Sequence, residues 1–386
     1  MQSTFDKKNQ HIYLDHSATT PVDSRVVEAM LPCFSDIYGN PSSLHYAGRA
    51  AREAVEQARA AIAEILNARE SEIYFVSGGT EADNLAIQGV AFQNRQKGDH
   101  IITTQVEHPA VLNTCRFLEK QGFSVTYLNV DQYGQVDPDA VKQAIRKETI
   151  LISIIHANNE VGTINPLKEI GKIAREAGVY FHTDAVQSFG KIPLDMQSLP
   201  VDMLSVSGHK IYGPKGIGIL YVRRGVDYRA LAYGGSQERK RRPGTENVPA
   251  IVGLGAAARL MHREMSQHRE KVGALRDEFQ SRLTARFPGV KINGHPQQRL
   301  YNILNVSFPA IDNETLLLRL DMAGIAVSTG SACSSGSIEP SHVLRAMGIP
   351  ARQAKSSIRF SFGKDNTPRE VERVVEVLAS ILSGGS

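Results

Sequence analysis

The feature that most constrains the fold is a regular alternation of apolar strands and helical segments across residues 72–184. The segment 150–156 is almost entirely apolar, which is typical of a strand buried on both faces of a sheet. The pattern predicts strands at 72–76, 101–106, 125–130, 150–156 and 179–184, and helices at 80–94, 109–121, 138–146 and 167–177. Strands and helices that alternate in this way form mostly parallel sheets with helices on both faces. We therefore expect an α/β fold.

Two later segments modify this expectation. The apolar segments 203–206 and 217–222 are too close for a helix to connect them, so they should pair antiparallel and make the sheet mixed. A helical pattern over 249–287 follows, as one long helix or two consecutive ones. Strand and helix signals then recur at 303–308, 314–322, 342–347, 357–362 and from Pro368 onward, which indicates a smaller α+β domain.

Composition excludes several classes of protein. A net charge of +4 is far from that of a dedicated nucleic-acid binder. No apolar run approaches the ~18 residues of a membrane span, and the polar residues 1–10 do not resemble a signal peptide. The three cysteines, Cys33, Cys115 and Cys333, form no C-x-x-C pair, so disulfide frameworks and structural zinc sites are not expected. A reducing, cytoplasmic compartment fits this cysteine usage best.

Three motifs carry candidate chemistry. Ser77-Gly78-Gly79-Thr80-Glu81 joins a strand to a helix, where free N–H groups and the positive helix end suit a phosphate; a simple helix cap is the alternative. Asp184 ends an apolar strand, so its carboxylate should face a cation or cap the next element. His182-x-Asp184 also opens a 2-His-1-carboxylate iron motif, which the surrounding strand–helix alternation disfavours.

The third motif is Ser207-Gly208-His209-Lys210, which follows an apolar strand and precedes a glycine-rich turn. A partly desolvated lysine has a lowered pKa and can act as an amine nucleophile; an ordinary surface lysine is the alternative. A phosphate cradle, a carboxylate and a lysine able to form a Schiff base are what pyridoxal 5′-phosphate (PLP) requires. The three motifs together therefore predict a PLP site.

Three further residues are candidates for the same site. His108 follows a strand end and could stack on a ring or move protons, or only begin a helix. Cys333 lies among small residues in 330–336, where an accessible thiol can become a nucleophile or remain unreactive. Arg359 interrupts a strand and suits a substrate carboxylate or a structural ion pair. The patterns around Cys33 and Cys115 are apolar and helical, so both should belong to the core.

From about Tyr13 to about Gly363 the chain resembles the NifS/IscS-like cysteine desulfurases, a class-V aminotransferase branch of the fold-type I PLP enzymes. The resemblance rests on motifs in a fixed order: 14–21, 39–43, 77–84, Glu107-His108, Asn158-Asn159-Glu160, 184–187, Ser207-Gly208-His209-Lys210 with Gly213-Pro214-Lys215-Gly216, 242–247, 330–335 and Arg359-Phe360-Ser361. So many ordered motifs make the match specific.

The resemblance implies a role for each matching residue. Lys210 would hold PLP as a Schiff base and move the substrate α-proton, and Cys333 would accept the sulfur. The cofactor would be bound by Gly79, Thr80, Ser207, His209 and Thr245 at the phosphate, Asp184 at the ring nitrogen, His108 on the ring face and Gln187 at the ring hydroxyl. Asn159, which also lies among the expected cofactor-binding residues, Arg359 and Asn40 would bind near the substrate carboxylate. Thr245 would come from the other subunit of a homodimer. No resident metal is implied, although Cys333 could contact an iron–sulfur unit transiently.

The resemblance also implies an activity and a domain division. The expected reaction removes sulfur from L-cysteine, releases L-alanine and leaves a persulfide on Cys333 for an acceptor such as an iron–sulfur scaffold protein. The alternative is another class-V enzyme, such as a selenocysteine lyase, cystine lyase or aminotransferase, none of which needs a thiol that accepts sulfur. We expect a large PLP-binding domain at 16–262 and a small domain at 1–15 and 263–386 that carries the Cys333 loop. The sequence ends at Ser386, so we do not expect the C-terminal extension by which some members dock a scaffold.

Overall fold

The computed structural model describes residues 11–309, 311–330 and 340–383. Its centre is a seven-stranded sheet with the order β2-β8-β7-β6-β5-β3-β4. The strands are β2 (Ile73–Val76), β3 (His100–Thr104), β4 (Ser124–Leu128), β5 (Thr149–Ser153), β6 (Tyr180–Asp184), β7 (Met203–Ser207) and β8 (Gly218–Val222). Only β8 runs antiparallel to its neighbours β2 and β7, so the predicted mixed, mostly parallel sheet is confirmed.

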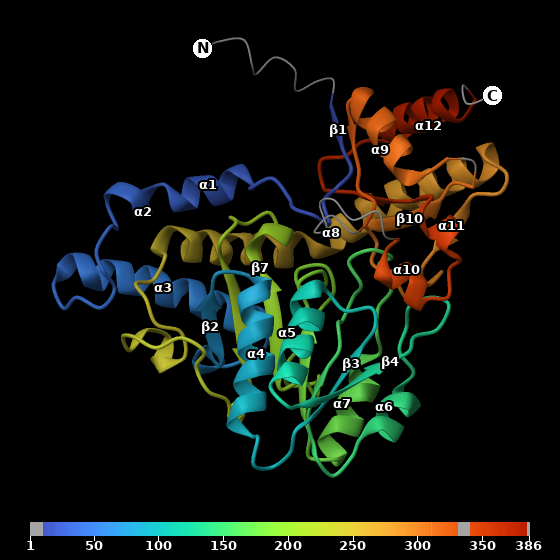
Figure 1. Cartoon of the computed structure of the whole chain (residues 1–386). Coiled ribbons are helices and arrows are strands. Elements are labelled where there is room, and N and C mark those ends of the chain that lie inside the picture. The colour runs from blue at the N-terminus through green and yellow to red at the C-terminus, as the bar shows by residue number, and fades with distance from the viewer. Residues whose placement is uncertain (1–10, 310, 331–339, 384–386) are drawn as a thin grey trace.

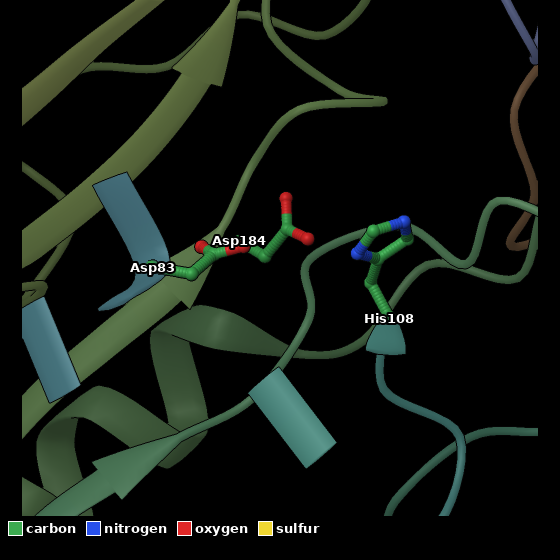
Figure 2. A group of neighbouring side chains, drawn as sticks. All are labelled: Asp83, His108 and Asp184. Carbon is green, nitrogen blue, oxygen red and sulfur yellow. The ribbon is translucent and has the colours of Figure 1, made fainter. Parts of the chain in front are cut away.

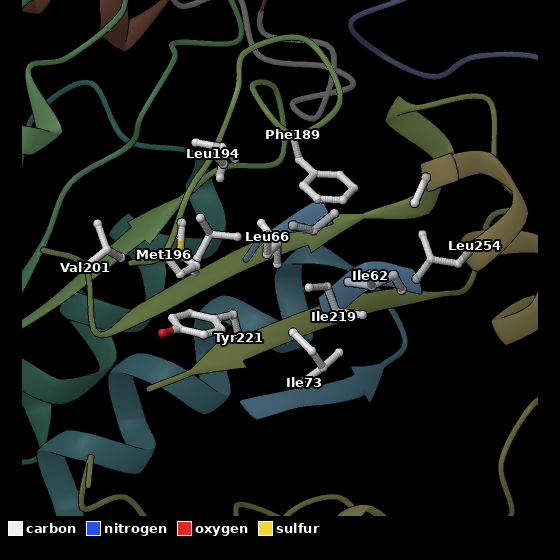
Figure 3. Close-up of a cluster of buried hydrophobic side chains, with 14 of the residues drawn as sticks. Ile62, Leu66, Ile73, Phe189, Leu194, Met196, Val201, Ile219, Tyr221 and Leu254 are labelled. Atoms are coloured by element: carbon white, nitrogen blue, oxygen red, sulfur yellow. The ribbon is translucent and has the colours of Figure 1, made fainter. Parts of the chain in front are cut away.

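Helices cover both faces of this sheet (Figure 1). On one face lie α4 (Gly79–Gln93) and α5 (Pro109–Lys120), and on the other lie α3 (Tyr46–Ile65), α6 (Pro138–Ala144), α7 (Leu167–Glu176) and the first part of α8 (Val248–Arg286). Successive strand residues alternate between the two layers, as a pleated strand requires. Ile101 packs with the α4–α5 layer, for example, and Ile102 with the other. Figure 3 shows part of the layer on the α3 face of the sheet, where Ile62 of α3 and Leu66, just after its end, meet Ile219 and Tyr221 of β8.

A second, smaller core lies beside the first. It surrounds the antiparallel sheet β12-β10-β9, formed by β9 (Lys291–Asn293), β10 (Ile303–Ser307) and β12 (Ser357–Ser361), with α9 (Asn313–Met322) and α12 (Pro368–Ser383) packed against it. The helix α8 is continuous over 39 residues and contributes to both cores. Its residues up to Met261 pack with the large sheet, and those from Val272 onward pack with the small one.

The remaining elements are short. They are β1 (Ile12–Tyr13), which pairs in parallel with β11 (Ile325–Ala326), the helices α1 (Ser24–Met30), α2 (Pro32–Ser35), α10 (His342–Ala346) and α11 (Ala351–Ala354), and the 3-10 turns η2 (Glu70–Glu72), η3 (Gly208–Lys210) and η4 (Gln237–Lys240). Ile12 and Leu14 pack into the smaller core, so the start of the described chain joins its C-terminal part. Within the described residues, no helix is both long and apolar enough to cross a membrane.

Candidate active site

A cavity of about 720 Å³ lies beyond the carboxyl ends of β6 and β7, between the two cores. This is the position at which ligands bind in open α/β sheets. Ten of the thirteen residues expected at the site line this cavity: Gly79, Thr80, His108, Asn159, Asp184, Gln187, Ser207, His209, Lys210 and Arg359. They come from segments far apart in the sequence, so the fold brings together what the motifs predicted separately.

One end of the cavity is suited to an anion. The helix α4 spans 15 residues and has no side-chain cap at its N-terminus, which begins at Gly79. A Cβ at Gly79 would lie 2.7 Å from Cγ2 of Val186, so any larger residue would force Val186 to shift. Ser207 and His209 line the same end. Uncapped N–H groups and the positive helix end, beside hydroxyl and imidazole groups, form a phosphate cradle.

Asp184, at the end of β6, lies deep in the cavity. Its Oδ1 accepts a hydrogen bond from the backbone N–H of Val186 at 2.9 Å. Burial raises the pKa of Asp184, while the nearby His108 and Lys210 oppose this shift. A buried carboxylate is best stabilised by a cation. The pyridinium nitrogen of PLP is such a cation, so Asp184 fits the role of its partner.

Asp83 of α4 is a neighbour that the sequence interpretation missed. One potential ligand atom each from Asp83, His108 and Asp184 lies within 4.8 Å of the others, and Figure 2 shows the three side chains converging from different elements. Burial and the neighbouring Asp184 raise the pKa of Asp83 well above its usual value. The ring of His182 lies 2.9 Å from the hydroxyls of both Ser153 and Ser205. Its nitrogens are therefore engaged with serines, which does not support the 2-His-1-carboxylate alternative.

His108 forms the side of the cavity and is also the N-cap of α5. Its Nδ1 accepts a hydrogen bond from the backbone N–H of Ala110 at 3.1 Å, and Pro109 follows at the first helical position. Burial lowers the pKa of His108. The helix-start alternative and the ring-stacking role are therefore compatible, because the cap fixes a neutral imidazole against the cavity.

Lys210 lies in the turn η3 that follows β7. Its Nζ donates hydrogen bonds to the carbonyl oxygens of Ser17 and Ala18, both at 2.6 Å. The amide Nε2 of Gln187 also donates to Ser17 O, at 2.9 Å, while the buried Oε1 of Gln187 has no hydrogen-bond partner. An amide oriented into the cavity with one polar atom unsatisfied is suited to a ligand hydroxyl. The residues present therefore fit PLP at its phosphate, ring nitrogen, ring hydroxyl and aldehyde.

The opposite side of the cavity is formed by residues of the smaller core. Arg359 of β12 donates from Nη1 to Asn159 O at 2.9 Å and from Nη2 to Asp15 Oδ1 at 2.8 Å. Its buried Nε has no partner. The structural ion pair considered for this residue is thus present, and the guanidinium still borders the cavity. Both interpretations of Arg359 apply together.

Glu160 contacts both flanks of the segment that carries Cys333. Ser341 Oγ donates to Glu160 Oε2 at 2.5 Å, and a Cβ at Gly330 would lie 2.7 Å from the same oxygen. Gly330 and His342 line the cavity, whereas Cys333 itself lies outside the described residues. The other two cysteines are buried, as expected for core residues, and burial raises the pKa of Cys115 to about 12.

Two expected site residues do not reach the cavity within this chain. Asn40 is exposed, and its Oδ1 accepts from the backbone N–H of Ser42 at 2.9 Å. Thr245 is exposed in the segment before α8. Besides Asp83, the sequence interpretation missed Glu107 and Lys191, which are buried. Glu107 follows Val106 and Lys191 precedes Ile192, a pattern that surface turns share, so no local signal identifies them as buried.

The fold and the site define a PLP-dependent enzyme of the α/β type. Residues 12–374 match the family model for class-V aminotransferases. The chain is 54% identical to a cysteine desulfurase IscS of Methanosarcina thermophila, over 97% of this chain and 93% of the relative. The chain belongs to the class-V aminotransferase family and, within it, to the NifS/IscS-like cysteine desulfurases.

Solved structures agree with this assignment. A NifS-like protein that is 40% identical superimposes with a TM-score of 0.92, over 97% of this chain and 99% of that one. A structure described as SspA in complex with cysteine is 41% identical and superimposes with a TM-score of 0.81, over 91% of this chain and 98% of that one. The α/β fold predicted from the sequence is thereby confirmed.

Proposed function

We propose that this chain takes sulfur from L-cysteine, releases L-alanine and holds the sulfur as a persulfide on Cys333. The observation that carries the proposal is that Gly330 and His342, which flank the segment containing Cys333, line the same cavity as Lys210. A thiol on that segment would work beside the lysine. An aminotransferase or a lyase needs no such thiol.

The residues that would hold the cofactor are those at the closed end of the cavity. Gly79, Thr80, Ser207 and His209 would bind its phosphate, together with Thr245 of the partner subunit. Asp184 would pair with the ring nitrogen, Gln187 with the ring hydroxyl, and His108 would cover the ring face. When bound, PLP withdraws electrons from the substrate Cα. Asp184 supports that withdrawal by keeping the ring nitrogen protonated.

The substrate would enter between this end and the side formed by Arg359. Arg359 and Asn159, with Asn40, would hold the carboxylate and thereby direct Cα toward Lys210 Nζ, which moves the α-proton. The thiolate of Cys333 then attacks the substrate sulfur. An S–S bond forms and the C–S bond breaks. Its electron pair stays with the substrate carbon, which takes up a proton to become the methyl group of alanine.

We also propose a homodimer. Five large apolar or aromatic side chains between residues 31 and 46 are more than half exposed: Leu31, Phe34, Tyr38, Leu44 and Tyr46. Such a patch is typical of a protein–protein interface. Thr245 and Asn40 do not reach the cavity of their own chain. In a dimer, each would instead be able to enter the cavity of the partner subunit.

The division into a large domain at 16–262 and a small domain at 1–15 and 263–386 is part of the proposal. It is supported by the two hydrophobic cores, which divide α8 between Met261 and Val272. A cytoplasmic enzyme that passes its sulfur to an acceptor, such as an iron–sulfur scaffold protein, agrees with the sparse cysteines and the IscS-type relatives.

The test is to incubate the purified enzyme with L-cysteine, alkylate the products and map the persulfide by mass spectrometry. We expect the extra sulfur on Cys333 and stoichiometric alanine. Cys333→Ser should keep the visible absorption of the bound cofactor and lose persulfide formation, whereas Cys33→Ser should retain both. Full sulfide release by Cys333→Ser without added thiol would contradict the role of Cys333 and favour a lyase.

A further inference from the structure

Lys191 is a buried lysine to which neither the motifs nor the proposed mechanism assigns a task. Only 7% of its surface is exposed, and its Nζ donates a hydrogen bond to the backbone oxygen of Gln187 at 2.8 Å. Buried lysines are rare because an ammonium group loses its hydration. A structural lysine would be expected to have a carboxylate partner, and the described residues form no salt bridge to Lys191. Its position therefore requires another explanation.

The hydrogen bonds link Lys191 to the catalytic lysine. Gln187, which accepts from Lys191, donates its side-chain amide to Ser17 O at 2.9 Å. Lys210 Nζ donates to that same oxygen at 2.6 Å. Two hydrogen-bonded residues thus connect one lysine with the other. Lys191 therefore contacts the backbone of a residue that lines the cofactor cavity.

The two lysines also border a second, small cavity of about 10 Å³, and Lys210 is the one described residue that lines both it and the active-site cavity. The other titratable groups that line it are His16, Tyr212, His268, Tyr301 and Lys364. None of these is a carboxylate; Asp23 and Glu264 pair with Lys364 and His268, and no salt bridge among the described residues joins either carboxylate to Lys191. Burial, and then the charge of Lys210, lowers the pKa of Lys191 to about 7. The two lysines therefore compete for a proton, and Lys191 carries its charge most readily when the Lys210 nitrogen is neutral.

Other neighbours of Lys210 favour its protonated form. The carbonyls of Ser17 and Ala18 accept from Nζ, and Asp184 is a nearby carboxylate, so all three favour an ammonium group. A lysine that must take a proton from the substrate has to be neutral at that moment. A second cation close to a lysine lowers the pKa of that lysine and so favours its neutral form.

We propose that Lys191 is a positioning residue: its charge next to Lys210 disfavours a proton on the Lys210 nitrogen, so that this nitrogen can react with the cofactor and then with the substrate α-proton. The inference rests on the proposed PLP function of Lys210. It adds a residue that acts through Lys210 without touching the substrate.

The test is a pH titration of the visible absorption of the holoenzyme, which reports protonation of the Lys210 nitrogen attached to the cofactor. Lys191→Gln removes the charge and can still donate to the Gln187 carbonyl, so the titration midpoint should rise by about one pH unit. Lys191→Arg keeps the charge and should stay near the wild-type midpoint. Lys172→Met, an exposed lysine of α7, is the control and should not change it.

A midpoint in Lys191→Gln within about 0.2 pH unit of the wild type would overturn the inference, even if thermal stability falls. If Lys191→Gln does not fold, Lys191→Met supplies the same charge removal with a side chain of similar length. A wild-type protein that takes up PLP and shows no visible band would overturn the function of Lys210 and this inference together. If the wild type shows the band and substitutions of Lys191 leave its titration midpoint unchanged, only this inference is overturned.

Discussion

The two sides of the active-site cavity are built in different ways. The floor, comprising Gly79, Asp184, Ser207 and Lys210, comes from the strand ends and one helix end of the seven-stranded sheet. The rim, comprising Glu160, Gly330, His342 and Arg359, joins the loop after β5 to the part of the chain around the smaller sheet. The floor groups lie at the ends of elements of one sheet layer, whereas the rim joins Arg359 of β12 and His342 of α10 to loop residues through a few side-chain contacts.

This difference assigns the two sides separate tasks. The floor groups are fixed by backbone hydrogen bonds in a buried sheet, which suits a cofactor that stays in place through many reaction cycles. The rim depends on contacts such as Ser341 to Glu160 and Arg359 to Asp15, which connect residues 181 and 344 positions apart. A side held by few contacts can open for a substrate and for a sulfur acceptor without disturbing the floor.

Removing the floor lysine should give the largest effect. Lys210→Ala leaves no amine to attach the cofactor or to move the α-proton, so we expect kcat to fall by about 10²–10⁴-fold or more. Absorption spectroscopy should also show that the visible band of the attached cofactor is lost. Lys215→Ala, an exposed lysine in the next turn, is the matched control and should retain both. An unchanged band in Lys210→Ala would contradict the assignment of the floor.

At the rim, a conservative substitution should change substrate binding more than turnover. Arg359→Lys removes the planar fork that can bind a carboxylate through two N–H groups, so the KM for cysteine should rise by about 10- to 100-fold. Asp15→Asn breaks the same ion pair without changing the guanidinium. If Arg359 were only structural, steady-state kinetics and thermal unfolding would show equal KM and Tm changes in the two variants. We expect equal losses of stability and unequal KM values.

The floor was more predictable from sequence than the rim, for a physical reason. The turn at Ser77–Glu81 and the strand ends at Asp184 and Ser207 combine local backbone geometry with residue type, and both can be recognised from a few neighbouring residues. Contacts of the rim depend on how the two cores pack. The pairing of Arg359 with Asp15 follows from β1 and β12 lying together, and two-residue strands such as β1 leave no periodic signal.

The ends of the helices and strands, and the burial of charged residues, were likewise hard to predict from local sequence. The predicted strands and helices of the large sheet are present with ends that differ by at most three residues, and the long helical segment is one helix, which periodicity alone left open. Glu107 and Lys191 were missed because the local pattern of a charged residue beside apolar ones is also that of a surface turn. Their burial is decided by helices that pack over them from other parts of the chain.

Glu107, beneath the floor, should give the smallest effect on catalysis and a distinct effect on stability. Its side chain is fully buried, and burial raises its pKa from 4.5 to about 8. Oε1 accepts from Thr104 Oγ1 and from the backbone N–H of Ile155, while Oε2 has no partner, so no cation or donor stabilises a negative charge on Oε2. Glutamine reproduces this arrangement with an oxygen and an uncharged NH₂ group.

The direction of the pH effect follows from proton linkage. Below the unfolded pKa of 4.5 both states of Glu107 are protonated, and stability is complete. As the pH rises toward 8, the unfolded chain releases the proton while the folded chain keeps it, so the wild type loses stability. Glu107→Gln lacks this loss. Its Tm relative to the wild type should increase by about 4 °C or more between about pH 5 and about pH 8.5.

Thermal unfolding at both pH values, followed by circular dichroism, measures this difference. Glu119→Gln, on the solvent side of α5, is the control and should show a pH dependence parallel to the wild type. Activity should change little, because Glu107 does not line the cavity itself and glutamine keeps an oxygen that can accept from the backbone N–H of Ile155, while the contact of His342 is to the backbone oxygen of Glu107. A Glu107→Gln variant whose Tm follows the wild type at both pH values would mean that Glu107 ionises in the folded protein. The stability of the floor would then depend on an ionised carboxylate and its partners, as the stability of the rim depends on the ion pair between Arg359 and Asp15.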